Sequence, residues 1–361
     1  MIGRTLGFYF LRRYGAIAAW NFVGIAALVF IVTFTEVAGR ASGFENYTIG
    51  WALAVASLQL PILMQQAVPF IGLIAAMATL ISLNRKYELV IARAAGISAW
   101  QFLTPITFGA FLFGLIALLV LNPIAALGFA KSEALQAEVR GASTIANSQT
   151  TRWLKQRTEN GEAFIGADAT TDNGTTLIRP AFLLVGPDGH ITERLDAQSA
   201  TLQDGYWQLE SAVRHREAVP SERMETLRLA TNLRPEYVSQ ELLDPQALSI
   251  FQLPFRIQEA DSLGLRASSF ATQFHSLVAL PALLVAMTLI AATVSMRFTR
   301  LGQSGTMILG GILAGFLLYV VSVLMKAFGG SGVVPPLIAA WTPVIIATFF
   351  GITFLLFKED G

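Results

Sequence analysis

The sequence contains no cysteine, and charged side chains are scarce. Without thiols the chain cannot form disulfide bonds, thiolate zinc sites, iron–sulfur clusters or a cysteine nucleophile. Only 14% of the 361 residues are charged, against about 25% in an ordinary soluble domain, whereas 54% are hydrophobic. The net charge is +1, so no basic field is available to hold a nucleic acid. This composition excludes a soluble globular domain, a disordered chain and a nucleic-acid-binding protein, and it predicts a membrane protein.

Motifs for common enzyme chemistry are absent as well. The sequence has no phosphate-binding loop of the form G-x-x-x-x-G-K-[ST], no H-E-x-x-H pair of zinc ligands and no G-x-S-x-G nucleophile. The three histidines are scattered, and we interpret His275 as a packing or interfacial residue at the start of an apolar run. The sequence therefore predicts that the chain is not an enzyme and binds no metal ion or cofactor of its own.

Long apolar runs are what the sequence does contain. A membrane-spanning helix needs about 20 mostly apolar residues, and six runs are long enough: 14–36, 52–82, 100–128, 268–296, 304–328 and 336–357. The first exceeds the apolar core of a signal peptide, about 7–15 residues, so we expect a retained helix. In the second, Pro61 and Pro69 predict a kink or a tilt.

Ionisable residues are rare inside these runs. The second, third, fourth and sixth runs contain no Asp, Glu, Lys or Arg. Ion-coupled carriers usually hold the driving ion on a charged side chain within the membrane. The sequence therefore argues against such a carrier, and the energy for any transport should come from elsewhere.

Basic residues divide unevenly between the two sides of the predicted spans. One side holds nine of them, and the short segments of the other side hold two; the nine are Arg4, Arg12, Arg13, Arg85, Lys86, Arg93, Arg297, Arg300 and Lys358, and the two are Arg40 and Lys326. Lys and Arg accumulate on the cytoplasmic side of membrane proteins. The asymmetry predicts cytoplasmic termini and places the segment between spans three and four on the far side.

That segment, 131–266, has the composition of a soluble domain. It contains 14 of the 25 basic and 19 of the 24 acidic residues, a net charge of −5. Strand-like runs at 152–157, 162–169 and 206–217 are separated by turn signals at Asn160–Gly161, Pro187–Gly189 and Asp204–Gly205. We expect a jelly-roll-like β-domain that binds an amphipathic ligand, docks a partner through a sheet edge, or serves only as a spacer.

The predicted fold is thus an α-helical polytopic membrane protein with six transmembrane helices and an inserted periplasmic all-β domain. Its expected parts are spans one to three in 1–130, the β-domain with its connectors in 131–266, and spans four to six in 267–361. Of the connectors, 131–140 is expected to continue span three as a helix, and 243–266 to return the chain to the membrane.

The loop 84–98, NRKYELVIARAAGIS, is short and helix-prone. Gly96 is placed to end the helix, and Ser98 with Gln101 fits a capping box that opens the third span. Glu88 is expected to pair with Arg85 at i,i+3, beside an apolar side made of Tyr87, Val90, Ile91 and Ala94. This helix either carries an ordinary solvated ion pair, lies in the membrane interface, or inserts into a cytoplasmic partner that pushes on it.

Several segments together resemble the LptF/LptG family, the permease subunits of the lipopolysaccharide-export ABC transporter. They are YELVIARAAGIS (87–98), DPQALSI (244–250), Pro281 with RFTRLGQSG (297–305), and VVPPLIAAWTP (333–343). The layout of three helices, a β insert and three helices agrees over nearly the whole chain. The length and the last segment are more similar to LptG than to LptF.

The resemblance implies a permease that extracts lipopolysaccharide from the inner membrane of a Gram-negative bacterium. It implies an LptF-like partner permease, an LptB-like ATPase dimer that carries the ATP and Mg, an LptC-like single-span protein and an LptA-like periplasmic bridge. Residues 84–98 match the coupling helix, in which Glu88 engages an arginine of the ATPase. The ATPase-coupling candidates are Tyr87, Glu88, Arg93 and Gly96.

A lipid cavity between the first and fifth spans is implied too, because Tyr319 matches an aromatic residue of the cavity wall. The lipid-cavity candidates are Phe30, Thr33, Phe34, Arg40, Phe316, Tyr319 and Lys326. Thr33 stands where some family members carry a cation, so headgroup capture should rely on Arg40, Lys326 or the partner chain. Gly311 and Gly315 form a G-x-x-x-G motif that permits close helix approach in the fifth span.

One alternative from another functional class remains open. The chain would then be a signal-transmitting or tethering protein that senses a periplasmic partner through the insert and relays motion through 84–98.

Overall fold

The computed structural model describes residues 3–41, 48–141, 152–158, 161–167, 169–171, 176–186, 191–216, 219–231, 245–262, 267–295 and 305–359. The chain forms two compact units, Met1–Gln136 with Pro245–Gly361, and Ala137–Asp244. The predicted turn residues Asn160 and 187–189, and the basic residues Arg297 and Arg300, lie outside the described residues.

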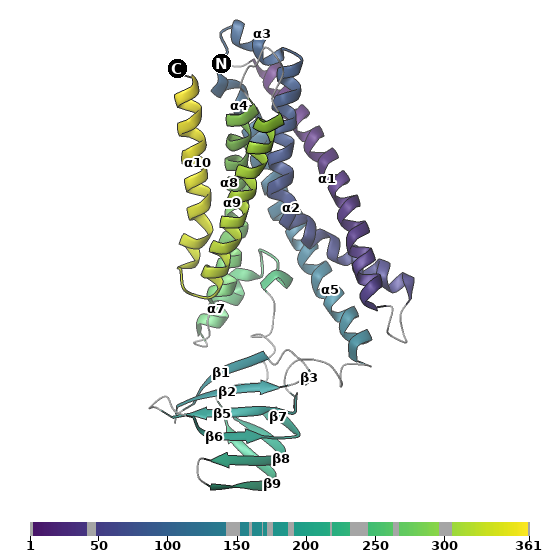
Figure 1. Ribbon diagram of the computed structural model, residues 1–361, viewed down its shortest axis with the longest axis vertical. Helices are drawn as coiled ribbons and strands as arrows, with labels where there is room; N and C mark the ends of the chain where they lie inside the picture. Colours follow the sequence, from purple (N-terminus) through teal and green to yellow (C-terminus); the bar gives the residue numbers. More distant parts are fainter. Residues whose placement is uncertain are drawn as a thin grey trace. The chain divides into compact units, whose positions relative to one another are not determined.

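The first unit is helical, and six of its described helices are long and apolar enough to cross a membrane, as predicted. The first two spans are α1 (Arg4–Ala41) and α2 (Ile49–Arg85), and the third is continuous from α4 (Ala99–Ile116) through η1 (Ala117–Leu121) to α5 (Asn122–Gly141). The last three are α8 (Ser268–Ser295), α9 (Gly305–Gly330) and α10 (Pro336–Glu359). Pro61 and Pro69 both lie inside α2. Helix α1 begins and α10 ends at the end of the bundle that carries the short helix α3 (Glu88–Ala94) (Figure 1).

Helix α8 forms the centre of the bundle, because α2, α4, α9 and α10 all pack against it. Small residues allow these close contacts. A Cβ atom at Gly114 of α4 would lie only 2.6 Å from the Cα atom of Pro281 in α8, so the two backbones nearly touch. By contrast, α1 and α9 are mostly exposed and present apolar side chains on their outer faces.

The third span is not a uniform helix. It runs from α4 (Ala99–Ile116) through a five-residue π-helical segment, η1 (Ala117–Leu121), into α5 (Asn122–Gly141). Such π-helical segments are rare, and they frequently occur at functional positions. At the end of this one, Asn122 donates to Gln65 Oε1 of α2 at 3.3 Å and accepts from the Ile250 N–H at 2.7 Å.

The β-unit occupies the middle of the segment 131–266, and most of the two connectors on either side of it belongs to the helical unit. Helix α5 continues without a break past Lys131 to Gly141. On the return, Leu248, Ile250 and Leu253 are buried with residues of η1 and α8. The segment 245–262, with η3 (Pro245–Ala247) and α7 (Leu253–Ser262), therefore belongs to the helical unit, because its apolar side chains pack there.

The second unit is an antiparallel β-fold, close to a barrel, as the turn signals predicted. Its strands are β1 (Arg152–Thr158), β2 (Gly161–Ala167), β3 (Ala169–Thr171), β4 (Thr176–Ile178), β5 (Ala181–Val185), β6 (Ile191–Asp196), β7 (Ser199–Gln203), β8 (Tyr206–Arg216) and β9 (Val219–Ala230). Their order is β1-β2-β5-β6-β8-β7-β4-β3, with β9 also paired to β8. Phe182 and Trp207 meet edge to face in its core.

Strand β8 changes its partner on one edge along its length. Tyr206–Glu210 pairs with β7, whereas Val213–Arg216 pairs with β6. Ser211, between the two halves, has a positive φ of 53°, which is uncommon for a residue other than glycine. The predicted turn Asp204–Gly205 joins β7 to β8, and Gly205 takes the left-handed conformation there.

Candidate functional site

Helix α3 is a short element that two left-handed residues separate from the spans on either side. Helix α2 ends at Arg85, and Tyr87 then adopts a φ of 59°. Gly96, with a φ of 83°, ends α3 as the sequence predicted, and Ser98 and Gln101 form the predicted capping box of α4. A seven-residue helix is too short to be stable by itself in water, so its contacts with the bundle hold it in place.

The outer side of α3 is apolar and exposed, as predicted. Tyr87 and Ile91 are 70% and 66% exposed, and Val90 and Ala94 are exposed beside them. Leu89 and Ala92 point the other way and are buried. Exposed apolar side chains on a short helix, next to a carboxylate, form a surface suited to a groove in another protein.

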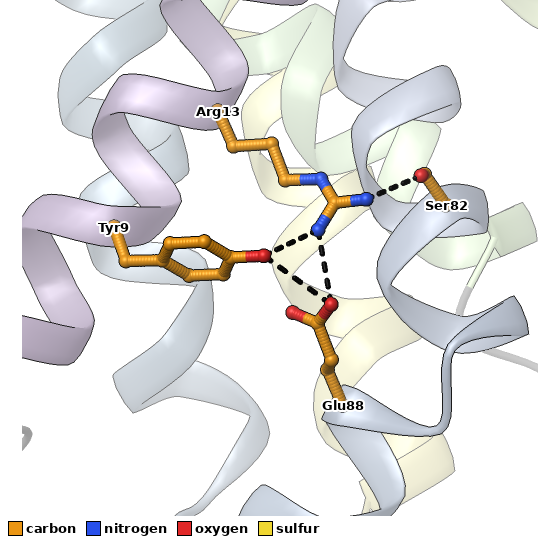
Figure 2. Close-up of polar contacts among 4 residues, drawn as sticks. All are labelled: Tyr9, Arg13, Ser82 and Glu88. Carbon is orange, nitrogen blue, oxygen red and sulfur yellow. Dashed lines mark hydrogen bonds and ion pairs between the residues drawn. The ribbon is translucent and has the colours of Figure 1, made fainter.

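Contrary to the prediction, the carboxylate of Glu88 does not pair with Arg85. The left-handed turn at Tyr87 interrupts the helix between these residues, so their i,i+3 spacing no longer places them on one face. Glu88 Oε1 instead accepts from Arg13 Nη1 of α1 at 3.0 Å and from the Tyr9 hydroxyl at 3.2 Å (Figure 2).

Arg13 joins three helices. Its Nη2 donates to Ser82 Oγ of α2 at 2.7 Å, and its Nη1 also donates to the Tyr9 hydroxyl at 2.5 Å (Figure 2). The side chains of Arg13 and Glu88 are only 15% and 26% exposed. Sequence reasoning missed Arg13 and Tyr9, because nothing in the pattern distinguishes Arg13 from Arg12 as a partner for a residue 75 positions away.

Arg93 and Gly96 complete the predicted coupling set. The Arg93 guanidinium lies 5.9 Å from the ring centroid of Phe102 in α4, so a cation–π contact ties the end of α3 to the third span. The structure thus gathers Tyr87, Glu88, Arg93 and Gly96 on and around α3.

The candidates on α1 lie along one stretch of helix, but their surroundings differ. Phe30 and Phe34 stack with ring centroids 6.4 Å apart, and Phe34 packs against the buried cluster of Val37, Ala52 and Val55. Thr33 is only 4% exposed. Arg40 is well exposed and pairs with Glu36 at 3.4 Å.

The candidates on α9 pack against α2. Tyr319 and Phe316 flank Phe70 of α2, at centroid distances of 4.7 and 6.3 Å. Sequence reasoning missed Phe70, although it lies in the second apolar run. A Cβ atom at Gly315 would lie 2.2 Å from Leu73 of α2, so the G-x-x-x-G motif does permit the predicted close approach. Lys326 is half-buried near the other end of α9.

The candidate residues therefore form separate groups rather than a single site. Helix α3 lies at one end of the bundle, and α7 lies at the other (Figure 1). The aromatic groups of α1 and α9 occur on two helices that both pack against α2. Among the described residues there is no group of three or more His, Asp or Glu side chains that would hold a metal ion.

The comparison with protein families gave one match. A family model described as lipopolysaccharide export system permease LptF/LptG matches residues 1–357, nearly the whole chain. The comparison with curated proteins gave no match.

Proposed function

The chain belongs to the LptF/LptG family of lipopolysaccharide export permeases, and on this premise we propose that it extracts lipopolysaccharide from the inner membrane with energy supplied by a separate ATPase. It is a multi-pass membrane protein with six spans. In the proposed complex an LptF-like chain is its partner, and an LptB-like ATPase dimer binds ATP and Mg. An LptC-like protein and an LptA-like bridge receive the lipid on the periplasmic side. The LptG-like character rests on its length and the segment 333–343.

The observation that carries this proposal is the exposed apolar side of α3 beside the partly exposed Glu88. Ile91 and Tyr87 form a projection that a groove in a cytoplasmic partner would bury. Glu88 adds one negative charge at its base, which a partner arginine would recognise. Because four of the apolar runs carry no Asp, Glu, Lys or Arg, an ion gradient has no evident binding site there, and the proposal assigns the driving force to a partner.

The lipid path of the proposal runs beside α1 and α9. Both helices expose apolar surface that suits acyl chains, and Phe316 of α9 is exposed next to Tyr319. Since Thr33 carries no charge, the proposed cations for headgroup phosphates are Arg40, Lys326 or residues of the partner chain.

A reconstitution experiment tests the proposal. Vesicles containing this chain, an LptF-like permease and an LptB-like ATPase are expected to release lipopolysaccharide to an acceptor only with ATP. Glu88→Lys should abolish release, because it places two cations against each other at the coupling contact. An arginine-to-glutamate change on the ATPase should restore release in part, since the introduced lysine would still face Arg13 of α1. Release that proceeds equally without ATP would contradict the proposal.

Photo-crosslinking separates transport from a tethering role. A crosslinker at Phe316 should capture lipopolysaccharide in working vesicles. Capture of protein alone at this position, together with protein capture by the β-unit, would instead favour the signal-transmitting alternative.

A further inference from the structure

The Arg13–Glu88 pair carries an inference beyond the contact of α3 with a partner. We propose that Arg13 is a positioning residue for energy coupling. It fixes α3 to α1 through one oxygen of Glu88 and leaves the other oxygen for the partner's cation, so that force applied to α3 reaches α1 directly. This inference rests on the proposed function, because it assumes that α3 receives that force.

The contacts of the Glu88 carboxylate show how one oxygen can bind α1 while the other binds a partner cation. Arg13 and Tyr9 both use Glu88 Oε1, and Oε2 makes no hydrogen bond or ion pair with any described residue. A carboxylate has lone pairs on both oxygens and can accept from two cations at once. A partner arginine therefore need not displace Arg13.

The placement of Arg13 favours a mechanical role over an ordinary surface ion pair. Exposed pairs contribute little because water competes for them. Arg13 is largely shielded and is held from three sides, by Tyr9 on its own helix, Ser82 on α2 and Glu88 on α3 (Figure 2). A planar guanidinium can satisfy these acceptors in fixed directions, which a lysine ammonium cannot do equally well.

The other described supports of α3 lead mainly to α2 and α4. The short helix packs mainly against α2, to which Lys86 and Tyr87 connect it directly. The Arg93 guanidinium lies over the ring of Phe102 in α4. Glu88, by contrast, bonds to two side chains of α1, Arg13 and Tyr9. Helix α1 also carries Phe30 and Phe34, so the pair connects the proposed coupling contact to a helix of the proposed lipid path.

The test compares Arg13→Met with Arg12→Met in the reconstituted complex. Arg12 neighbours Arg13 on α1 but is exposed, so it serves as a matched control. Arg13→Met should keep the ATPase bound and hydrolysing ATP, yet lower the lipid released per ATP about tenfold. That factor corresponds to about 1.4 kcal/mol, close to the net contribution of one charge-assisted hydrogen bond. Arg12→Met should match the unmodified chain.

A distance measurement reports on α3 itself. Because the chain has no cysteine, spin labels attach only at introduced positions. Gly15→Cys on α1 and Ala95→Cys at the end of α3 are exposed sites outside the proposed partner contact, and a side chain at Gly15 meets no neighbour. The distribution of label distances should broaden with Arg13→Met and stay narrow with Arg12→Met.

The lipid released per ATP and the distribution of label distances together decide the outcome. Broadening together with a lower lipid yield per ATP supports the proposal. If both stay unchanged, or if only one of them changes, Arg13 does not act by positioning α3 and the proposal is overturned. Should Arg13→Met fail to assemble, Arg13→Lys replaces it; it keeps the charge, and intermediate values of both readouts are then expected. Failure of the proposed function is distinct, because the unmodified complex would itself show no ATP-dependent release.

Discussion

At the residue scale, buried polar side chains determine how the helices are held in register. Asn122 is the clearest case, with 1% of its surface exposed at the end of the π-helical segment. Its amide connects Gln65 of α2 to the backbone of Ile250, which belongs to the segment returning from the β-unit. A buried donor or acceptor that loses its partner costs about 1–3 kcal/mol. Asn122 therefore fixes the returning segment against the third span.

Asn122→Leu should lower the free energy of unfolding by about 2–4 kcal/mol, because it leaves both the Ile250 N–H and the Gln65 amide buried without partners. Hydrogen exchange at Ile250 should accelerate. Gln66→Leu is the control, since the bond of Gln66 to Gln246 is exposed and its loss should change stability by less than about 0.5 kcal/mol. Thermal or detergent denaturation measures both, and equal midpoints for the two variants would show that Asn122 has no such role.

Individual residues were predictable where the signal is local. Gly96 as a helix stop and the Ser98–Gln101 capping box depend on neighbours within four positions, and both were confirmed. The Arg13–Glu88 pair was not predictable, because it depends on how α1 docks against the end of α2. Phe70 was missed for a similar reason: in an apolar run, the sequence does not say which aromatic side chain meets another helix.

At the element scale, six spans and the β-strands could be predicted from apolar run lengths and turn signals, which depend on composition alone. The ends of the elements could be predicted only in part. Helix α5 extends past Lys131 to Gly141, as the run 131–140 indicated, whereas the burial of Leu248 and Leu253 in the helical unit depends on distant residues and left no local signal. The change of pairing partner in β8 near Ser211 was not predicted either, because it depends on the strands on either side of β8.

The prediction at the element scale concerns the close packing of α4 against α8. Gly114→Ala should destabilise the bundle by about 1–3 kcal/mol, since the added methyl group would meet the backbone of Pro281, which cannot rotate away. Gly310→Ala on α9 meets no atom within 4 Å and should be neutral or slightly stabilising, because alanine favours helix. Melting temperatures in detergent compare the two. A Gly114 variant that melts no lower than the Gly310 variant would mean that α4 and α8 are not in close contact.

At the scale of the whole molecule, charge and architecture support the same orientation. Helix α1 begins and α10 ends at the α3 end of the bundle (Figure 1). Most of the basic residues outside the insert occur near these segments, including Arg12, Arg13 and Arg93. The excess of basic residues predicts that this end is cytoplasmic. The same rule predicts that the β-unit, which carries most of the acidic residues, is periplasmic.

Cysteine labelling in intact spheroplasts tests this orientation, and the absence of native cysteine makes every signal specific to the introduced site. Asp204→Cys lies in the exposed turn between β7 and β8 and should react with a membrane-impermeant maleimide added outside. Ala94→Cys on α3 should react only after the membrane is permeabilised, because a helix that receives force from a cytoplasmic ATPase must face the cytoplasm. Both residues are exposed in the chain, and labelling after permeabilisation without the ATPase shows that protection reflects the membrane rather than burial. Labelling of Ala94→Cys in intact cells would reverse the topology and remove the basis for ATPase coupling through α3.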